Sequence, residues 1–176
     1  MGGSPDIRDC VAADIADIAA IINDAAAAYR GIIPADRWKE PYMPDSELVD
    51  EIAAGVRFQG FEEDGVLKGV MGVQEVKDVT LIRHAYVDPA AQGRGIGAAL
   101  LDNCRASARR PLLIGTWAAA DWAIRFYEKH GFEKTSVAEK QRLLRTYWTI
   151  PERQIETSVV LADGRWFTAN PTANRA

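Results

Sequence analysis

The sequence predicts an α+β domain built around a mixed β-sheet, and two observations lead to that fold class. In the first half, Asp64-Gly65 separates two β-prone runs, which is a strong hairpin signal. From residue 93 onward, segments of helical and strand pattern alternate along the chain. Hydrophobic residues make up 48% of the 176 positions and charged residues 26%, so the chain has enough apolar mass for a core.

The first 55 residues predict a short strand and two helices. Residues 7–10 read as the strand. The helix after it carries an apolar stripe at spacings of three and four, formed by Ile15, Ile18, Ile22, Ala25 and Tyr29. Gly31, Pro34 and Pro41 then break the chain into a loop. A second helix is expected from about Asp45, a residue type common at helix starts, to Gly55, a common terminator.

The remaining elements follow from turn signals and periodicity. Residues 57–63 and 66–76 form the predicted hairpin, and a further strand over 79–87 stops at Asp88-Pro89. Helices are expected over 93–107, over 123–130 with Gly131 as terminator, and over 138–148 before Pro151. Strands are expected over the apolar run 112–117 and over 155–161. We therefore expect one domain over residues 7–161, between tails at 1–6 and 162–176.

Composition excludes several classes of protein. The net charge of -4 argues against a general nucleic-acid binder, which would need a dense basic face. No apolar run approaches the ~18 residues of a spanning helix, and residues 1–9 lack the form of a signal peptide. Cys10 and Cys104 form no CxxC pair, and two histidines make a metal site improbable. We expect a protein of the reducing cytoplasm with no metal, no nucleic acid and no membrane as partner.

The segment from Val87 to Gly97 carries the clearest chemical signal. It leads from a strand into a helix N-terminus and contains Gly93, Gly95 and Gly97. Unpaired N–H groups and the positive end of a helix dipole attract phosphate there. A Walker loop would need Lys and then Ser or Thr after the last glycine, but Ala98-Ala99 follows. The glycine spacing and the position late in the strand order do not fit a dinucleotide fold either.

Two blocks resemble the GNAT N-acetyltransferase superfamily. The first is Gln92-x-x-Gly95-x-Gly97, preceded by Val87-x-Pro89 and followed by residues 98–101; it resembles that family's acyl-CoA pyrophosphate loop. The second, residues 123–132, resembles the family's downstream helix and following strand. The resemblance implies a three-layer α/β/α fold with a mixed, mostly antiparallel central sheet and a splay between two strands. It also implies acetyl-CoA as acyl donor and an amine as acceptor.

The resemblance assigns roles position by position. The backbone of Ala85, Tyr86 and Val87 would pair with the pantetheine arm. The pyrophosphate would be held by the N–H groups of Gln92, Gly93, Arg94, Gly95, Ile96, Gly97 and Ala98. Phe126 would pack near the cofactor, and Tyr127 would face the thioester sulfur and protonate the leaving thiolate. On helical spacing alone Tyr127 would be a core residue, because it lies on the apolar stripe of its helix.

The general base stays open between Glu75, His84 and Asp121. An imidazole has a pKa near ~6.5, which suits proton acceptance at neutral pH, but His84 also fits a hydrogen-bonded residue within a sheet. Two positions depart from the family pattern. Ala120 stands where many members have Asn, and Gly115 stands where one branch has a catalytic Glu. The branch that acetylates protein N-termini is therefore a weak match.

The expected acceptor side combines aromatic and charged residues: Tyr29, Arg30, Trp38, Tyr42, Trp117 and Trp122. Residues 1–60 hold 5 basic and 11 acidic side chains, which favours a cationic amine. We expect N-acetylation of a small primary amine. A non-catalytic acyl-CoA sensor and a protein-modifying acetyltransferase are the alternatives. The apolar face of the helix over 138–148 could cover the site or join two copies in a homodimer.

Overall fold

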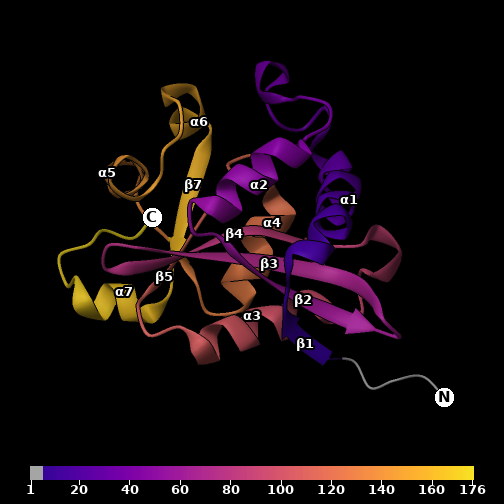
Figure 1. The fold of residues 1–176 in the computed structure, drawn as a ribbon. Coiled ribbons are helices and arrows are strands. Elements are labelled where there is room, and N and C mark those ends of the chain that lie inside the picture. The colour runs from indigo at the N-terminus through magenta and orange to yellow at the C-terminus, as the bar shows by residue number, and fades with distance from the viewer. Residues whose placement is uncertain (1–5) are drawn as a thin grey trace. The chain divides into compact units, whose positions relative to one another are not determined.

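The computed structural model describes residues 6–176, so residues 1–5 of the expected N-terminal tail lie outside the described part (Figure 1). The chain divides into two compact units. The first unit comprises the residues up to Arg30 together with Trp38–Gln74 and Ile82–Ser107. The second unit comprises Gly31–Arg37, Glu75–Leu81 and Ala108–Ala176. Each unit has its own hydrophobic core, and each is described by itself below.

Seven strands form a sheet with the order β1-β2-β3-β4-β5-β7-β6. The strands are β1 (Asp6–Asp9), β2 (Arg57–Glu63), β3 (Val66–Val76), β4 (Val79–Val87), β5 (Leu112–Trp117), β6 (Glu133–Lys134) and β7 (Ser158–Ala162). The pairs β1–β2, β2–β3, β5–β7 and β6–β7 are antiparallel. The prediction of an α+β fold with a mixed sheet is confirmed.

The hairpin between β2 and β3 has the predicted turn. Glu63 pairs with Val66, and the two residues between them, Asp64 and Gly65, have φ values of 53° and 77°. Positive φ at both central residues matches the right-handed twist of the flanking strands. Aspartate tolerates this conformation and glycine adopts it freely, so the pair Asp-Gly specifies this connection.

The first unit packs helices on both faces of its strands. Helices α1 (Ile15–Ala26) and α2 (Asp45–Ala53) cover one face, where Ile22, Leu48 and Val70 share a core cluster. Helix α3 (Ile96–Ser107) lies beside Gly69, the residue before Val70. Consecutive residues of a strand point to opposite faces, so α3 covers the face opposite α1 and α2.

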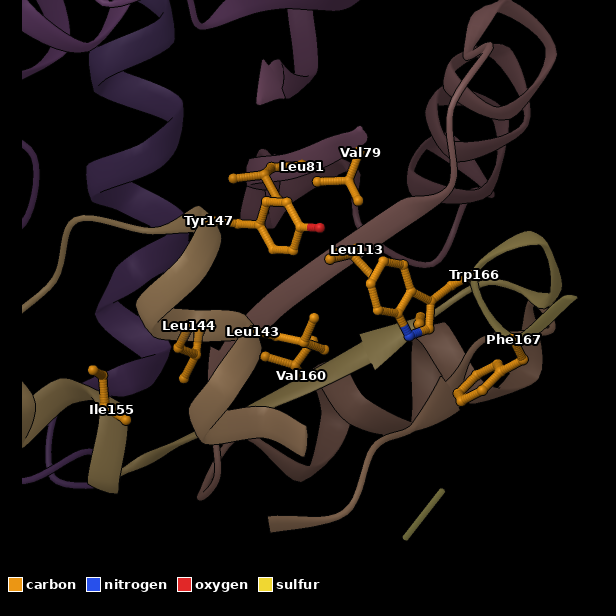
Figure 2. Packing of buried hydrophobic residues seen from close by; sticks show 11 residues of the cluster. Val79, Leu81, Leu113, Leu143, Leu144, Tyr147, Ile155, Val160, Trp166 and Phe167 are labelled. Atoms are coloured by element: carbon orange, nitrogen blue, oxygen red, sulfur yellow. The ribbon is translucent and has the colours of Figure 1, made fainter. Parts of the chain in front are cut away.

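The second unit contains four helices, α4 (Asp121–Lys129), α5 (Val137–Tyr147), α6 (Glu152–Glu156) and α7 (Gly164–Ala169). Its core gathers side chains from the start of β4, from β5 and β7, and from α5, α6 and α7 (Figure 2). Trp166 of α7 is the largest fully buried residue of this cluster. None of the helices within residues 6–176 has both the length and the apolar character that crossing a bilayer requires.

Several boundaries differ from those predicted. Ile155 lies in helix α6, and the last strand begins only at Ser158, because a short amphipathic helix resembles a strand over so few residues. The third helix begins at Ile96, since Gly93 and Gly95 adopt left-handed conformations that precede it. The residues expected as a C-terminal tail contain α7, which buries Trp166 and Phe167.

The apolar face of α5 packs inside the second unit. Leu143, Leu144 and Tyr147 are buried in the core cluster, so this face is not available for a contact with a second copy. Trp148, at the end of α5, lies over Gly115 of β5: a Cβ at position 115 would meet the indole at 3.3 Å. The extra helix therefore covers β5 at the position where one branch of the family carries a glutamate.

Asp14 ties the first strand to the first helix. Arg8 donates to both oxygens of its carboxylate, at 2.8 and 2.9 Å, and the Val11 N–H donates at 2.7 Å. The hydrogen bond from Arg8 comes first among the causes that lower the pKa of Asp14 to about 2, followed by the bond from the Val11 backbone. The folded state thus binds a proton at Asp14 less readily than the unfolded chain does.

We expect Asp14→Asn to remove a pH-dependent part of the stability. Because the folded pKa lies below the unfolded value of 3.8, the stabilisation is fully present above about pH 4 and is lost as the pH falls through about 2. The free energy of unfolding should drop by at most about 2 kcal/mol at pH 6, and by much less near pH 2. Urea unfolding at pH 2–6 checks this; a difference that does not depend on pH contradicts it.

We expect Gly115→Glu to destabilise the second unit. The new side chain must displace Trp148 and Leu144, and overpacking of this kind costs roughly 1–3 kcal/mol. Gly164→Glu is the matched control, because nothing lies within 4 Å of a Cβ at that exposed helix start. Thermal unfolding should show a lower midpoint for the first variant only, and equal midpoints would disprove the packing described.

Candidate active site

The loop after β4 presents a helix N-terminus at the protein surface. Asp88 caps a single 3-10 turn, with its side chain accepting from the Ala90 N–H at 2.9 Å. Gly93 and Gly95 follow with φ values of 77° and 80°, a region that side-chain-bearing residues avoid. Residues 92–95 are exposed. The two glycines allow the chain to turn sharply into α3.

The first turn of α3 offers N–H groups to an anion. The Ala99 N–H donates to the Gly95 carbonyl at 3.0 Å. The N–H groups of residues 96–98 precede that bond and have no intrahelical acceptor. Together with the positive end of the helix dipole they fit a phosphate, so the residues present suit the pyrophosphate of a CoA molecule. The Arg94 side chain is already bound within the protein, because its guanidinium donates to both Glu63 carboxylate oxygens at 2.7 and 2.8 Å.

Gly69 is the reason that α3 can begin so close to β4, and nothing in the sequence reasoning pointed to it. A Cβ at this position would lie 2.7 Å from the Ile96 side chain and 3.4 Å from the Tyr86 carbonyl oxygen. A glycine inside a strand pattern often marks such a close approach. Ile96 itself is buried, so of this residue only the backbone is offered to a ligand.

The end of β4 joins an aromatic cluster. Ala85, Tyr86 and Val87 are half-buried. The Tyr86 ring meets Tyr29 edge-on, with centroids 6.3 Å apart, and Tyr29 in turn lies 5.6 Å from Tyr42. Burial, with contributions from Tyr29 and Tyr42, raises the pKa of Tyr86 well above its usual value, which keeps its phenol protonated.

Three of the expected acceptor residues lie in this cluster or beside it. The Trp38 ring stacks on Tyr42 at 5.7 Å, and the Arg30 guanidinium lies over Trp38 at 5.4 Å. Glu40 accepts from the Trp38 indole N–H at 3.3 Å and also pairs with Arg30. The structure therefore brings together Tyr29, Arg30, Trp38 and Tyr42 of the expected acceptor side and adds Glu40 and Tyr86 to them.

The remaining predicted aromatic residues belong to the second unit. Tyr127 on α4 is 6% exposed, and its ring meets Phe126 at 5.1 Å and Phe132 at 5.7 Å. Trp117 on β5 is also buried, whereas Trp122 on α4 is 45% exposed. Phe126 further contacts the ring of His130, whose Nδ1 lies 2.7 Å from the Phe126 carbonyl oxygen. Tyr127 thus has the packing of a core residue that also carries a hydroxyl group.

The candidate bases have very different surroundings. Glu75 is 47% exposed and lies 3.7 Å from Arg110, and Asp121 is an exposed residue 4.0 Å from Arg125. His84 is half-buried and forms a hydrogen bond with Glu51 of α2. Its φ of 52° is unusual for a strand residue other than glycine. Glu51 was not found from the sequence, because no spacing rule links a helix residue to a strand 33 positions later.

The two departures from the family pattern have a structural basis. Ala120 is fully buried and precedes α4, with its carbonyl accepting from the N–H groups of Ala123 and Ile124. Its helix start therefore has no side-chain cap. At Gly115, the indole of Trp148 occupies the space into which a side chain would point.

Comparison with known proteins agrees with this local geometry. Residues 54–134 match the acetyltransferase (GNAT) domain family. That segment contains both the loop after β4 and helix α4. No curated protein matches the sequence.

Solved structures share the fold. The paia N-acetyltransferase of Thermoplasma acidophilum, in complex with coenzyme A, aligns with a TM-score of 0.68 and 18% identity over 92% of this chain and 99% of its own. The yncA structure from Salmonella typhimurium, with its cofactor acetyl-CoA, has a TM-score of 0.56 and 24% identity over 76% and 82%. N-acetylglutamate synthase of Neisseria gonorrhoeae, with coenzyme A and N-acetyl-glutamate, has a TM-score of 0.59 and 24% identity; 92% of this chain covers 35% of that one.

The fold and the matched segment point to the same activity. The similar structures place the present chain in a fold that recurs in complexes with coenzyme A and acetyl-CoA. The matched family segment carries the loop whose free N–H groups suit the cofactor pyrophosphate. Residues 54–134 thus match the GNAT acetyltransferase domain, and the chain shares its fold with acetyltransferase structures that hold coenzyme A or acetyl-CoA.

Proposed function

We propose that this enzyme transfers the acetyl group of acetyl-CoA directly to the primary amine of a small molecule. The observation that carries the proposal is the exposed loop of residues 92–95, which leads into the N-terminus of α3 through the left-handed Gly93 and Gly95. Direct transfer forms a bond from the amine nitrogen to the acetyl carbon and breaks the carbon–sulfur bond. The protein must therefore hold both reactants, free the amine of a proton and protonate the leaving thiolate.

For the cofactor, the proposed ligands are backbone groups. The N–H groups of residues 92–98 hold the pyrophosphate, and the backbone of residues 85–87 pairs with the pantetheine arm. Acetyl-CoA supplies the activated acetyl group as a thioester. Because Arg94 is bound to Glu63, phosphate affinity depends on oriented N–H dipoles more than on this side chain.

For the leaving group, the proposed acid is Tyr127. Its ring is fixed by Phe126 and Phe132, so its hydroxyl has a defined direction. A phenol placed by packing loses little entropy when it donates a proton or a hydrogen bond. Phe126, on the same helix, is proposed to contact the cofactor.

For the acceptor, the proposed contacts in the first unit are Tyr29, Arg30 and Trp38. Trp117 and Trp122 stay predictions from the sequence. The aromatic faces favour a cationic or apolar amine over an anionic one, while the Glu40 carboxylate is already paired with Arg30. The acid excess of residues 1–60 supports the same choice. The Neisseria synthase structure contains coenzyme A and N-acetyl-glutamate, and this chain covers 35% of that protein; a small-molecule acceptor is in line with it.

An acceptor screen tests the proposal. The purified protein is incubated with acetyl-CoA and a panel of amino acids, diamines, arylalkylamines and lysine-containing peptides, and release of free thiol is recorded. We expect release with at least one small amine. Gly95→Glu should abolish it, since a side chain there obstructs the loop, while Gly65→Glu, at the same φ in the β2–β3 turn, should not. Transfer to peptides alone would identify a protein-modifying enzyme instead.

We expect Tyr127→Phe to lower kcat by about 10²-fold, the usual effect of losing an acid catalyst. The ring and its packing remain, so the dissociation constant for CoA and the unfolding midpoint should change little. Steady-state kinetics with the best amine of the panel, calorimetry with CoA and thermal unfolding measure the three quantities. If kcat equals that of the parent protein, Tyr127 is a core residue only.

A further inference from the structure

The middle of β4 carries an irregular residue, His84, which lies between a carboxylate and an aromatic ring. His84 adopts φ 52°, a conformation that a residue with a side chain keeps only where its surroundings hold it in place. Its Nε2 is hydrogen-bonded to Glu51 Oε2, and its ring stacks on Phe58 with centroids 6.2 Å apart. A residue held in a strained conformation between two partners is a candidate for a functional role.

The left-handed conformation of His84 brings the side chains of Arg83 and His84 to the same carboxylate, that of Glu51. Glu51 Oε2 meets His84, and Glu51 Oε1 lies 3.5 Å from Nη2 of Arg83. Consecutive residues of a regular strand point to opposite faces, so a straight β4 would direct these two side chains apart. The left-handed residue allows α2 to meet both of them with a single side chain.

A second layer of hydrogen bonds fixes Arg83. Its Nη1 donates to Gln74 Oε1 at 3.0 Å, and the Gln74 amide donates to the Ala54 carbonyl at the end of α2 at 3.1 Å. Glu51 is therefore placed by its own helix and by a chain of bonds that returns to that helix. A carboxylate held at both oxygens gives His84 a fixed partner.

The charges around the pair determine which ring nitrogen is protonated. Burial alone would raise the pKa of Glu51, but the hydrogen bond and charge of His84, with the charges of Arg83 and Lys39, lower it below the ordinary value. Glu51 is therefore ionised at neutral pH and can only accept hydrogen bonds. In the neutral imidazole, Nε2 then carries the proton and Nδ1 keeps its lone pair.

We propose that His84 accepts the proton of the acceptor ammonium at Nδ1, and that Glu51 is the positioning residue that sets its tautomer and stabilises the imidazolium. The inference rests on the proposed acetyl transfer. In this step an N–H bond of the ammonium breaks and leaves its electron pair on nitrogen, while an N–H bond forms at Nδ1. The His84 side chain is 16% exposed, so the proton can pass on to solvent.

This assignment separates His84 from the other candidate bases. Glu75 and Asp121 are paired only with exposed arginines, and neither is linked to an element that would fix its direction. His84 lies on β4. In the branch of the family that uses a glutamate as base, that glutamate would lie on β5, at the position of Gly115. Trp148 covers that β5 position, so the base must come from another part of the chain.

The kinetic test compares His84→Gln and Glu51→Gln with Asp50→Asn, an exposed neutralisation on the same helix. We expect His84→Gln to lower kcat about 10²-fold and to remove the acid limb of the pH–rate profile, with CoA affinity unchanged. Glu51→Gln should lower kcat about 10-fold and move that limb to lower pH, because the imidazolium loses its anionic partner. Asp50→Asn should match the parent.

Three results would overturn the inference. An acid limb that survives in His84→Gln means that another group takes the proton. If kcat falls in both variants together with the unfolding midpoint, while the pH–rate profile keeps its shape, the contact between His84 and Glu51 is only structural. In the nitrogen NMR spectrum of the parent protein at pH 8, a proton on Nδ1 of His84 instead of Nε2 rejects the tautomer without any acceptor.

The screen separates this inference from the proposed function. Active parent protein together with active His84→Gln refutes the base and leaves acetyl transfer intact. Inactivity of the parent protein with every amine, despite CoA binding, refutes both. Activity of the parent protein with loss of the acid limb in His84→Gln supports both.

Discussion

The close packing of α3 against β3 at Gly69 determines where the cofactor loop can lie. A methyl group at this position would run into Ile96 and crowd Leu100, so the helix start would have to move away from β3. The loop of residues 88–95 is short, and its two left-handed glycines leave it little choice of path. The free N–H groups of α3 are therefore positioned by a missing side chain on a neighbouring strand.

The charged side chains of the first unit act mainly through ion pairs with one another, and the net charge of the chain says little about the cofactor. The overall charge of -4 suggests poor affinity for an anionic cofactor. Yet the proposed phosphate ligands are backbone dipoles, which a count of charged residues does not include. Arg94 is paired with Glu63 and Glu51 is paired with Arg83 and His84, so these charges serve to fix local geometry. The excess of acidic residues among the first 60 favours a cationic acceptor amine.

Much of the fold could be predicted because its signals are local. The strands over 57–63, 66–76, 79–87 and 112–117 have the predicted bounds, since turn residues or a compact apolar run define each. The short helices α6 and α7 were missed, because so few residues show no clear period and tertiary packing decides their structure. That residues 7–161 form a single domain stays a prediction.

Only those parts of the candidate site that belong to a sequence motif could be predicted from the sequence. The loop after β4 follows from its glycines, and Tyr127 from its family block. The convergence of Tyr42 and Tyr86 with Tyr29 required the three-dimensional structure, as did the contact between Glu51 and His84. The left-handed conformation of His84 has no sequence signature, since histidine is not a residue that turn rules expect there. Residues brought together by long-range packing leave no regular spacing in a sequence.

The contact between Trp148 and Gly115 also limits how this chain can evolve. A long side chain on the strand at position 115 needs a smaller residue at the end of the helix, because the Trp148 indole occupies that space. The two positions are 33 residues apart, and a change at the first is tied to a change at the second. Among descendants of this sequence they should covary, and a lineage that shortens the helix regains freedom to place a polar group on β5.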